Sequence, residues 1–444
     1  MRSRIFFVVL AMMLAFGASA QNADIESLAG LTFNFGNPGA RSLGMGGAFL
    51  GLADDASAAE ANPAGLTILI RPEVSVELRA NKTTQTYTVD GLWPEDFLRK
   101  DFVSKSETAE VSFASVIFPV GNWRLGGYYH RVMKYDANIN ALFGTDPFGQ
   151  PDTFSIFFFV GPNGPISQDQ CFDLGNDCQI FQLFPFLTSV DISLETFGGS
   201  VAYQFGKLSL GASVKRQEFE ESAFTFRTDT FFQPLAVTAQ QSKDSDIAYT
   251  AGFKWAPTRK FSLGGVYKTG GSFEAPYLFG SFDPNLNVDA QVVAVPKFNI
   301  PDQYGLGFSW SPVDALKINV DVVEITYSDL TNDFFSLFNP DDAQSFVIDD
   351  ATEIRAGFEY FFLNAKIPWA IRGGWYRDPD HSLRYDGPLL TGNQVAAKIL
   401  YPGGEDQDHW SMGVGFAFTK IQIDAAYSTS DKYKVGSISA IYKF

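Results

Sequence analysis

Residues 41–66 read RSLGMGGAFLGLADDASAAEANPAGL and follow neither the period of a regular helix nor that of a strand. The stretch contains five glycines, and four of them, Gly44, Gly46, Gly47 and Gly51, lie within its first eleven residues. Glycine accepts positive φ and lets backbones approach closely. Asp54 and Asp55 are placed to cap a short helix through residues 56–61, which Asn62-Pro63 would end. This pattern predicts a compact element held inside a surrounding structure.

The first twenty residues have the pattern of an export signal. Arg2 and Arg4 precede an apolar run over residues 5–17, and residues 18–20 read Ala-Ser-Ala, as at a signal cleavage site. We expect the mature chain to begin at Gln21. No other stretch approaches the roughly twenty apolar residues that a membrane-spanning helix needs. The sequence therefore predicts an exported protein without a transmembrane helix.

The composition argues against a nucleic-acid-binding protein and against an ordinary soluble one. The chain has 33 Lys and Arg against 50 Asp and Glu, a net charge of −17, so we expect no basic face for phosphates. It also has 44 Phe, while only 19% of its residues are charged. Apolar surface in contact with something other than water would explain this combination.

The only two cysteines, Cys171 and Cys178, lie in the segment CFDLGNDC. In an exported chain this spacing indicates a disulfide that closes a small loop. A metal site is the weaker alternative, because the segment has no His and no further Cys.

Most of the chain alternates apolar and polar residues with a period of two, which is the signature of strands with two different faces. In residues 410–419, one face carries Trp410, Met412, Val414, Phe416 and Phe418. The other face of that segment carries only Ser, Gly, Ala and Thr. We count fourteen such segments, which begin near residues 73, 108, 122, 189, 207, 245, 260, 302, 314, 350, 367, 409, 421 and 434.

The connections between these segments alternate in length. Short connections occur near residues 120, 206, 258, 312, 364 and 420, and a tight turn near residues 430–433 precedes the last segment. Long connections are expected near residues 80–106, 134–187, 221–243, 272–300, 328–349 and 377–407. Short turns at one end and long loops at the other indicate an up-and-down antiparallel barrel. An even number of strands places both chain ends at the short-turn end.

The apolar face of these segments is continuous and carries aromatic residues near the strand ends. They are Trp123, Trp255, Trp310, Trp369, Trp410, Tyr203 and Tyr442. The opposite face is rich in Gly, Ser, Thr and charged residues. This pattern predicts an all-β, 14-stranded antiparallel transmembrane barrel with its apolar face in lipid, in the outer membrane. A secreted β-sandwich or a lipocalin-like barrel is the alternative.

Three of the long loops are rich in apolar residues. The first contains Phe154, Phe157, Phe158, Phe159, Phe181, Phe184 and Phe186; the second contains Phe224, Phe226, Phe231, Phe232 and Leu235; the third contains Pro276, Tyr277, Leu278 and Phe279. Exposed apolar loops mark a binding surface, or they pack on one another as a roof over the barrel. Both interpretations stay open at this point.

These residues resemble the FadL-type long-chain fatty-acid transporters of bacterial outer membranes. The resemblance rests on Gly46-Gly47-Ala48, on residues 53–57 and on the motif Asn62-Pro63-Ala64, followed by fourteen strands and a terminal Phe444. It implies that residues 21–70 form a hatch that plugs a barrel of residues 71–444, the two making one domain. The hatch and gating residues would be Gly46, Gly47, Asp54, Asp55, Asn62, Pro63 and Ala64. It also implies passive uptake, with lateral exit of the ligand through a gap in the wall.

An apolar ligand with one charged head needs an apolar path and a fixed cation. Strand parity places eight cations in the lumen: Arg79, Arg124, Lys215, Lys254, Lys268, Lys317, Arg355 and Arg372. The candidates for the head group are those nearer the long loops: Arg79, Lys215, Lys268 and Arg372. The alternative for each is an ion pair across the lumen, with Glu77, Glu110, Asp321, Glu353, Glu359 or Asp424.

The sequence does not favour an enzyme. None of the three histidines, His130, His381 and His409, lies in a recognisable arrangement with a nucleophile and a carboxylate. Residues 44–47 read Gly-Met-Gly-Gly without a following Lys, so they do not form a phosphate loop. We expect no cofactor and no bound metal, although the acidic loop tips near residues 341, 349 and 378 could bind Ca²⁺.

The sequence thus predicts an outer-membrane channel for hydrophobic compounds, with long-chain fatty acids as the leading candidate ligand. The expected partners are outer-membrane lipid, a hydrophobic small molecule and the barrel assembly machinery, without nucleic acid. Tyr442 and the terminal Phe444 also resemble the C-terminal strand of outer-membrane proteins. A scaffold or shuttle of a surface-secretion complex is the alternative function.

Overall fold

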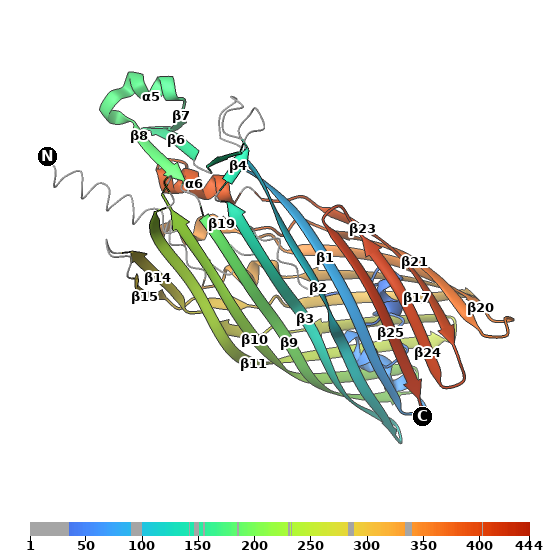
Figure 1. Cartoon of the computed structure of the whole chain (residues 1–444). Helices are drawn as coiled ribbons and strands as arrows, with labels where there is room; N and C mark the ends of the chain where they lie inside the picture. The colour runs from blue at the N-terminus through green and yellow to red at the C-terminus, as the bar shows by residue number, and fades with distance from the viewer. Residues whose placement is uncertain are drawn as a thin grey trace.

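In the computed structural model, the chain folds into a closed antiparallel barrel (Figure 1). The structure describes residues 35–89, 100–141, 143–145, 151–153, 156–183, 186–229, 231, 233–282, 288–333, 340–401 and 403–444. The predicted signal peptide, residues 1–20, lies outside the described residues. Among those that are described, no helix has both the length and the apolar character needed to cross a membrane.

The barrel consists of fourteen strands. In chain order they are β1 (Glu73–Val89), β2 (Lys100–Val120), β3 (Trp123–Ala141), β9 (Phe186–Phe205), β10 (Leu208–Thr228), β11 (Pro234–Thr258), β12 (Phe261–Lys268), β17 (Gln303–Val313), β18 (Leu316–Ile325), β20 (Ala351–Phe362), β21 (Trp369–Asp378), β23 (Gln407–Ala417), β24 (Ile421–Thr429) and β25 (Tyr433–Lys443). Each pairs antiparallel with its neighbours in this order, and β1 pairs with β25, with Glu73 opposite Lys443, to close the ring. The prediction of a 14-stranded antiparallel barrel is confirmed.

The described residues before β1 lie inside the ring, where Figure 1 draws them in blue. We call residues 35–70 the plug. It contains two short helices, α3 (Ala40–Leu43) and α4 (Ala58–Ala61), and the 3₁₀ helix η1 (Pro63–Ile68).

The remaining elements lie at the long-loop end. They are β4 (Phe143–Thr145), β5 (Pro151–Thr153), β6 (Ile156–Gly161), β7 (Gly164–Ile166), α5 (Gln168–Leu174), η3 (Gly175–Asp177), β8 (Gln179–Leu183), β13 (Ser272–Glu274), β14 (Tyr277–Phe282), β15 (Val288–Ala294), β16 (Lys297–Asn299), η4 (Tyr327–Thr331), η5 (Pro340–Ser345), β19 (Phe346–Val347), β22 (Arg384–Tyr385) and α6 (Gly392–Leu400). Strands β6 to β8 and α5 form an arm that projects beyond α6 (Figure 1). The C-terminus lies at the opposite, short-turn end, as the connection lengths predict.

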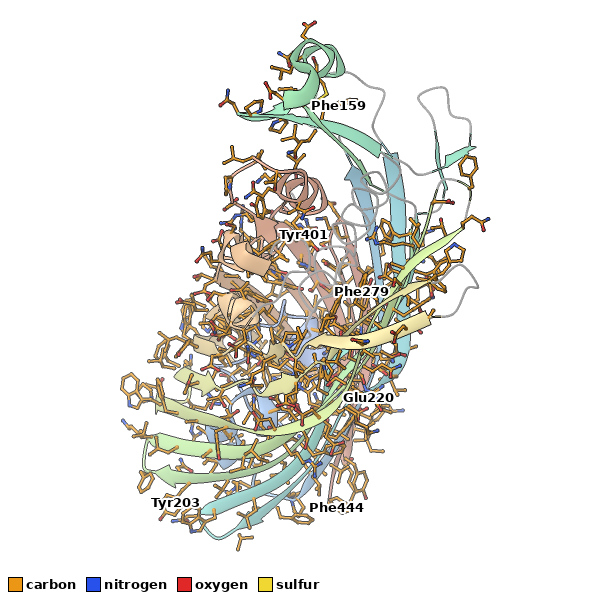
Figure 2. The ribbon with its side chains drawn as sticks, turned by 90° about the vertical axis from the view of Figure 1, so that its left-hand side faces the viewer. Phe159, Tyr203, Glu220, Phe279, Tyr401 and Phe444 are labelled. Atoms are coloured by element: carbon orange, nitrogen blue, oxygen red, sulfur yellow. A yellow bond between two sulfur atoms is a disulfide. The ribbon has the colours of Figure 1, made fainter. Side chains whose placement is uncertain are left out.

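The outward face of the wall is apolar, as expected for a barrel in lipid. Trp410 and Met412 are 64% and 66% exposed, and Trp123 and Trp310 are about half exposed. Outward aromatic side chains gather in two belts. Near the short turns Trp123 packs on Tyr203, with ring centroids 4.6 Å apart, and nearer the loops Tyr267 packs on Tyr304 at 4.8 Å. Tyr203 and Phe444 mark the lower end in Figure 2.

Two of the predicted long loops are mostly strand. Residues 80–106 were expected to be a loop, but β1 extends to Val89 and β2 begins at Lys100. Residues 221–243 likewise continue β10 and β11. The reason is that the two faces exchange their chemistry above the membrane. On β10, Val214 points outward and Ser213 inward, whereas six residues further along Glu220 points outward (Figure 2) and Phe219 is buried inside.

This exchange makes the upper inner wall apolar. Its buried residues include Val132, Met133, Tyr135, Phe186, Val190, Ile192, Leu194 and Phe219. In the membrane, the apolar residues of a strand face outward, and above the membrane they face inward. An analysis that expects apolar residues only on the outer face therefore ends the strand where this change occurs. The reversal instead shows where the wall leaves the lipid.

Some apolar residues of the long loops pack as a roof over the barrel, and others are exposed. Phe346, Tyr385 and Tyr401 pack edge to face over the barrel, with ring centroids 5.1 and 5.2 Å apart, and Tyr277 is fully buried. Phe231, by contrast, is 80% exposed. Phe154, Phe184 and Phe232 lie outside the described residues.

Candidate lumen site and plug

The plug is held by hydrogen bonds from wall side chains to its main chain. Ser200 of β9 donates to the carbonyl of Ala59 at 2.7 Å, and Ser262 of β12 donates to the carbonyl of Gly51 at 2.7 Å. The carboxylate of Asp321 on β18 accepts from the backbone N–H of Phe49 and of Leu50, at 2.6 and 2.8 Å. The inward Ser and Asp residues thus replace the partners that the irregular plug backbone lacks.

The helix predicted over residues 56–61 is shorter and is capped differently from the expectation. Helix α4 begins at Ala58, and Asp55 accepts a hydrogen bond from the N–H of Ser57 just before it, at 2.9 Å. Asp54 does not cap the helix, because its carboxylate forms ion pairs with Arg41 and with Lys317. Asn62 caps η1 instead, accepting from the N–H of Ala64 at 3.2 Å, and Pro63 begins that helix.

Glycines in the plug and glycines in the wall strands allow the two to pack closely. Gly46 and Gly47 adopt positive φ angles of 66° and 77°, a conformation that L side chains rarely accept. On the wall, a Cβ atom on Gly357 would lie 2.2 Å from the carbonyl oxygen of Met45. The frequent inward glycines of the strands therefore mark where the plug sits, a meaning that sequence reasoning did not assign to them.

A buried ion network centred on Arg41 joins the plug to β18, β20 and β21. Arg41 donates to both carboxylate oxygens of Glu359, at 2.9 and 2.7 Å, and also contacts Asp54 and Asp55. Glu359 also accepts from Arg372. Burial raises the pKa of Asp54, but Arg41 and Lys317 lower it more, so that it stays well below its usual range. Arg41 was not among the predicted site residues, because parity arguments address only the strands.

Three of the four predicted head-group cations form ion pairs. Arg79 pairs with Glu77 at 2.8 Å, Lys268 with Glu60 of the plug at 2.7 Å, and Arg372 with Glu359 and Asp424 at 2.7 and 2.8 Å. Although burial raises the pKa of Glu60, the neighbouring Lys268 ammonium lowers it to about 2, so this carboxylate is ionised at neutral pH.

Lys215 differs from these three. Its side chain is buried, 6% exposed, and within the described part of the chain it forms neither an ion pair nor a hydrogen bond. It lines a small cavity of about 20 Å³, the Lys215 cavity, with Phe35, Glu60, His130, Val132, Thr196, Gln217, Thr269, Ile300, Pro301 and Gln303. Both ring nitrogens of His130, the hydroxyl of Thr196 and the side-chain oxygen of Gln217 have no hydrogen-bond partner among the described residues. Buried polar groups of this kind are normally hydrogen-bonded, so these side chains are candidates to bind a polar group in the cavity.

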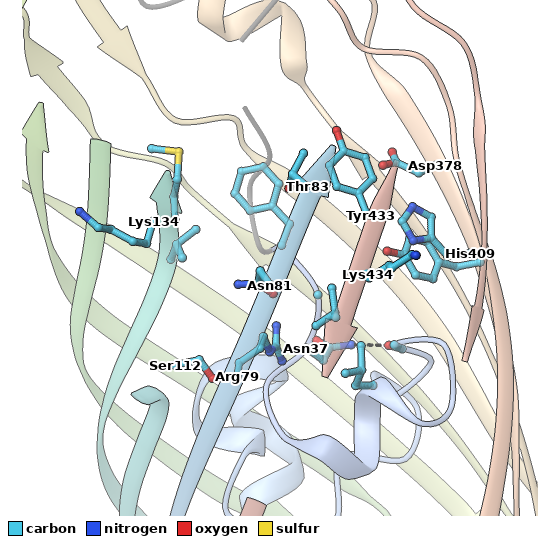
Figure 3. Close-up of a pocket in the computed structure, with 18 of the residues that line it drawn as sticks. Asn37, Arg79, Asn81, Thr83, Ser112, Lys134, Asp378, His409, Tyr433 and Lys434 are labelled. Atoms are coloured by element: carbon cyan, nitrogen blue, oxygen red, sulfur yellow. Dashed lines mark hydrogen bonds between the residues drawn. The ribbon is translucent and has the colours of Figure 1, made fainter. Parts of the chain in front are cut away.

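A second cavity of about 140 Å³, the upper cavity, lies above the plug and between β1, β3, β21 and β25 (Figure 3). Polar residues line much of it, including Asn81, Thr83, Ser112 and Lys434. Aromatic rings line the rest: His409 stacks on Tyr376 at 4.1 Å, and His381 stacks on Tyr327 at 3.9 Å. All three histidines of the chain therefore line the lumen, at His130, His381 and His409.

Phe35 and Val132 line both cavities. Phe35 belongs to the plug and packs toward Tyr327, with ring centroids 6.0 Å apart. Its ring therefore stands between the upper cavity and the Lys215 cavity.

The wall has a break between β2 and β3. These strands pair only over Phe113–Val120 and Trp123–His130, although β2 begins at Lys100 and β3 continues to Ala141. Register shifts fall at this point in both partners, at Ser112 of β2 and Val132 of β3. Such bulges bend strands and end their pairing. Arg131 and Glu110 form an ion pair across the break, and the N–H of Asp136 donates to Ser106 at 3.4 Å.

Cys171 and Cys178 form a disulfide in the projecting arm, with their Cα atoms 5.2 Å apart. In the described part of the chain, no group of three or more His, Cys, Asp or Glu side chains is placed to hold a metal ion. Of the acidic loop residues, Asp349 pairs with Arg384 at 2.6 Å.

A closed fourteen-stranded barrel with an apolar outer wall and an N-terminal plug is a fold of outer-membrane β-barrels. Several solved structures share this fold. A FadL homologue of Pseudomonas aeruginosa matches 93% of this chain and 99% of its own, with a TM-score of 0.60 and 15% identity. The toluene transporter TbuX of Ralstonia pickettii matches 93% and 99%, with a TM-score of 0.55 and 16% identity. The toluene transporter TodX of Pseudomonas putida matches 93% and 98%, with a TM-score of 0.53 and 14% identity.

The chain thus has the fold of the FadL-type outer-membrane channels, and the resemblance seen in the sequence is confirmed for the fold. No protein-family model matches the sequence, and no curated protein matches it.

Proposed function

We propose that the protein passes hydrophobic compounds across the outer membrane without energy input, and that long-chain fatty acids are its preferred ligands. The observation that carries this proposal is Lys215, a buried ammonium without an ion-pair partner in the described part of the chain. A carboxylate would supply the missing charge and accept a charge-assisted hydrogen bond. The apolar inner wall above, with Ile192, Leu194 and Phe219, suits a hydrocarbon chain.

The cavities support a path from the loops to the lipid. In this path, a ligand collects on the apolar loops, enters the upper cavity and places its head group at Lys215 once the Phe35 ring moves aside. It leaves through the break between β2 and β3, directly above the belt where Tyr129 and Phe197 pack at 5.3 Å. The residues proposed to keep the plug seated during passage are Gly46, Gly47, Asp54, Asp55, Asn62, Pro63 and Ala64. We assign the chain no enzymatic activity.

Uptake of a labelled long-chain fatty acid, compared in cells with and without the gene, tests the function. Faster uptake with the gene is expected, and equal rates would contradict a transporter. Protein purified in detergent should also retain bound fatty acid, which a secretion scaffold has no reason to hold. The barrel assembly machinery remains the proposed partner for insertion, through the terminal residues Tyr442 and Phe444.

The substitution Lys215→Met tests the site. It keeps the length of the side chain and removes the charge, so affinity for a fatty acid should fall about 10- to 100-fold, as expected for a charge-assisted hydrogen bond. Affinity for a neutral aromatic hydrocarbon should not change. Lys207→Met, in the exposed turn before the same strand, is the matched control. Equal fatty-acid affinity in both variants would remove Lys215 from the site.

The exit is tested with the pair Glu110→Cys and Arg131→Cys, whose side chains contact each other across the β2–β3 break. A disulfide there should slow uptake, and a reducing agent should restore it. Uptake that is indifferent to the disulfide would place the exit elsewhere.

A further inference from the structure

The wall has a second break, on the other side of the panel formed by β3, β9, β10 and β11. Strand β11 pairs with β12 over Thr250–Trp255 and with β14 over Ala236–Gln240. Between these two ranges, residues 241–249 have no strand partner on that side among the described residues. On its other side, the same stretch pairs with β10 without interruption. The break is therefore confined to one seam of the sheet.

The two-stranded sheet of β13 and β16, whose strands are joined through β14 and β15, fills this seam, and we call it the β13–β16 hairpin. It folds inward, and its Phe273 and Phe298 are buried against Phe219 of β10, with near-parallel rings 5.2 and 4.7 Å from it. Gly271, at the start of the hairpin, lies directly beside Gln217, which lines the Lys215 cavity. The hairpin is thus the layer that separates the seam from that cavity.

Carboxylates, rather than a strand ladder, fasten the hairpin to β11. Asp246 accepts from the N–H of Ser272, and Asp244 accepts from the N–H of Glu274, both at 3.0 Å. The hydroxyl of Ser242 adds a third bond, to the carbonyl of Glu274. Three side-chain hydrogen bonds, two of them exposed to water, contribute much less than a continuous ladder, since each is worth about 0.5–1.5 kcal/mol net.

The outer side of the seam is open. A groove of about 710 Å³ lies there, lined by residues 241–246 of β11 and by Ser272, Glu274, Pro276 and Lys297. Just below it, Ile247 and Tyr249 are 47% and 56% exposed on the lipid face, and Tyr267 and Tyr304 form the aromatic belt. The groove therefore begins where the apolar band ends, at the level of lipid head groups.

We propose that the β13–β16 hairpin is a side door through which an amphiphile of the outer leaflet enters the Lys215 cavity. This proposal rests on the proposed function, because it adds a lateral entrance to the axial one. Once Ser272 and Glu274 leave Asp246 and Asp244, the head group passes beside Lys297, which lines the groove, while the alkyl chain replaces the contacts of Phe273 and Phe298 with Phe219. The two breaks then serve as entrance and exit on opposite edges of one four-strand panel.

A thiol-labelling experiment tests the door independently of transport. The two native cysteines are joined in a disulfide, so Gln217→Cys introduces the only free thiol. In the full-length protein in vesicles, the added pair Asp244→Ala and Asp246→Ala should accelerate labelling of this thiol by a membrane-impermeant maleimide several-fold. The same pair should leave labelling of Ser112→Cys, in the upper cavity, unchanged. Equal labelling of Gln217→Cys with and without the aspartates would overturn the proposal.

A cross-link tests its role in uptake. The pair Asp246→Cys and Ser272→Cys, oxidised to a disulfide, should lower fatty-acid uptake from vesicle lipid, and reduction should restore it. The control pair Ser222→Cys and Gln241→Cys bridges β10 and β11 where they are already paired, and should have no effect. If wild-type protein transports fatty acid and the cross-linked variant transports it equally well, the side-door proposal is wrong and the proposed channel function is unaffected. If wild-type protein transports none, the channel proposal fails, and the labelling experiment alone decides whether the seam opens.

Discussion

The side-chain oxygen of Asn62, in the plug, lies 2.3 Å from the point that a Cβ atom on Gly252 of β11 would occupy. The amide nitrogen of Asn62 donates to the carbonyl of Phe253, the next residue in that strand, at 3.1 Å. The plug thus rests where the wall has no side chain, and it bonds to the backbone exposed there.

Gly252→Val should displace the plug, because the new side chain occupies the space of the Asn62 amide. Overpacking of this kind costs about 1–3 kcal/mol, which we expect to appear as a raised single-channel conductance in planar bilayers. Gly199→Val, on β9, is the matched control, since nothing lies within 4 Å of its Cβ position. Equal conductance of the two variants would show that the plug does not depend on this contact.

Asn62→Ala should loosen the plug without adding bulk. The change removes the bonds to Phe253 and to the carbonyl of Leu50, and it removes the cap of η1. With net contributions of about 1 kcal/mol for each bond, the open state should become detectable as passage of small solutes through liposomes. Liposomes as tight as those with wild-type protein would count against a gating role for the motif.

Arg41→Met should weaken the plug more than Asn62→Ala, because it leaves Glu359, Asp54 and Asp55 buried with less positive charge. Removing one partner of a buried ion pair costs about 3–5 kcal/mol. We expect a lower melting temperature by calorimetry in detergent, together with higher conductance. The double variant Arg41→Met with Glu359→Gln should recover part of the loss. No recovery would indicate that the Arg41–Glu359 pair does not carry the effect.

The strand count, the face that meets lipid and the location of the plug could be predicted because each has a local signal in the sequence. Period-two alternation fixes strand faces, and the eight inward cations follow from parity alone, as Arg372 and Lys215 illustrate. The length of the strands could not be predicted, because Phe219 and Glu220 reverse the expected faces. A prediction that requires outward residues to be apolar ends each strand at the membrane boundary.

The candidate site was predicted only in part. Parity selected Lys215 but gave no reason to prefer it over Lys268, because the partner of Lys268 is Glu60 of the plug, and strand parity does not predict contacts between the plug and the wall. The aromatic lining of the upper cavity was missed for the same reason. His409 and Tyr376 come from strands β23 and β21, and only the register of the closed barrel brings their rings together.

Phe35→Ala should join the two cavities. The ring borders both, so its removal opens a path from the upper cavity to Lys215 without touching either polar lining. We expect faster binding of a fluorescent fatty acid in stopped-flow measurements, with little change in the final affinity. Phe231→Ala is the control for loss of an aromatic ring, because Phe231 is exposed in a loop and lines neither cavity. Unchanged binding rates would mean that Phe35 does not limit access.

Acidification should release the plug through Glu60. Its pKa is about 2 in the plugged barrel against the ordinary 4.5, so the difference is worth about 3 kcal/mol. A lowered pKa stabilises the folded arrangement fully above pH 4.5, and that stabilisation is lost as the pH falls from 4.5 towards 2. Asp54, whose pKa is also lowered, acts in the same direction, so conductance at pH 3 should exceed that at pH 7. The variant Glu60→Gln isolates the contribution of Glu60, because it should show higher conductance at pH 7 and a smaller increase on acidification. An equal increase in wild-type and variant protein would show that Glu60 and Lys268 do not hold the plug.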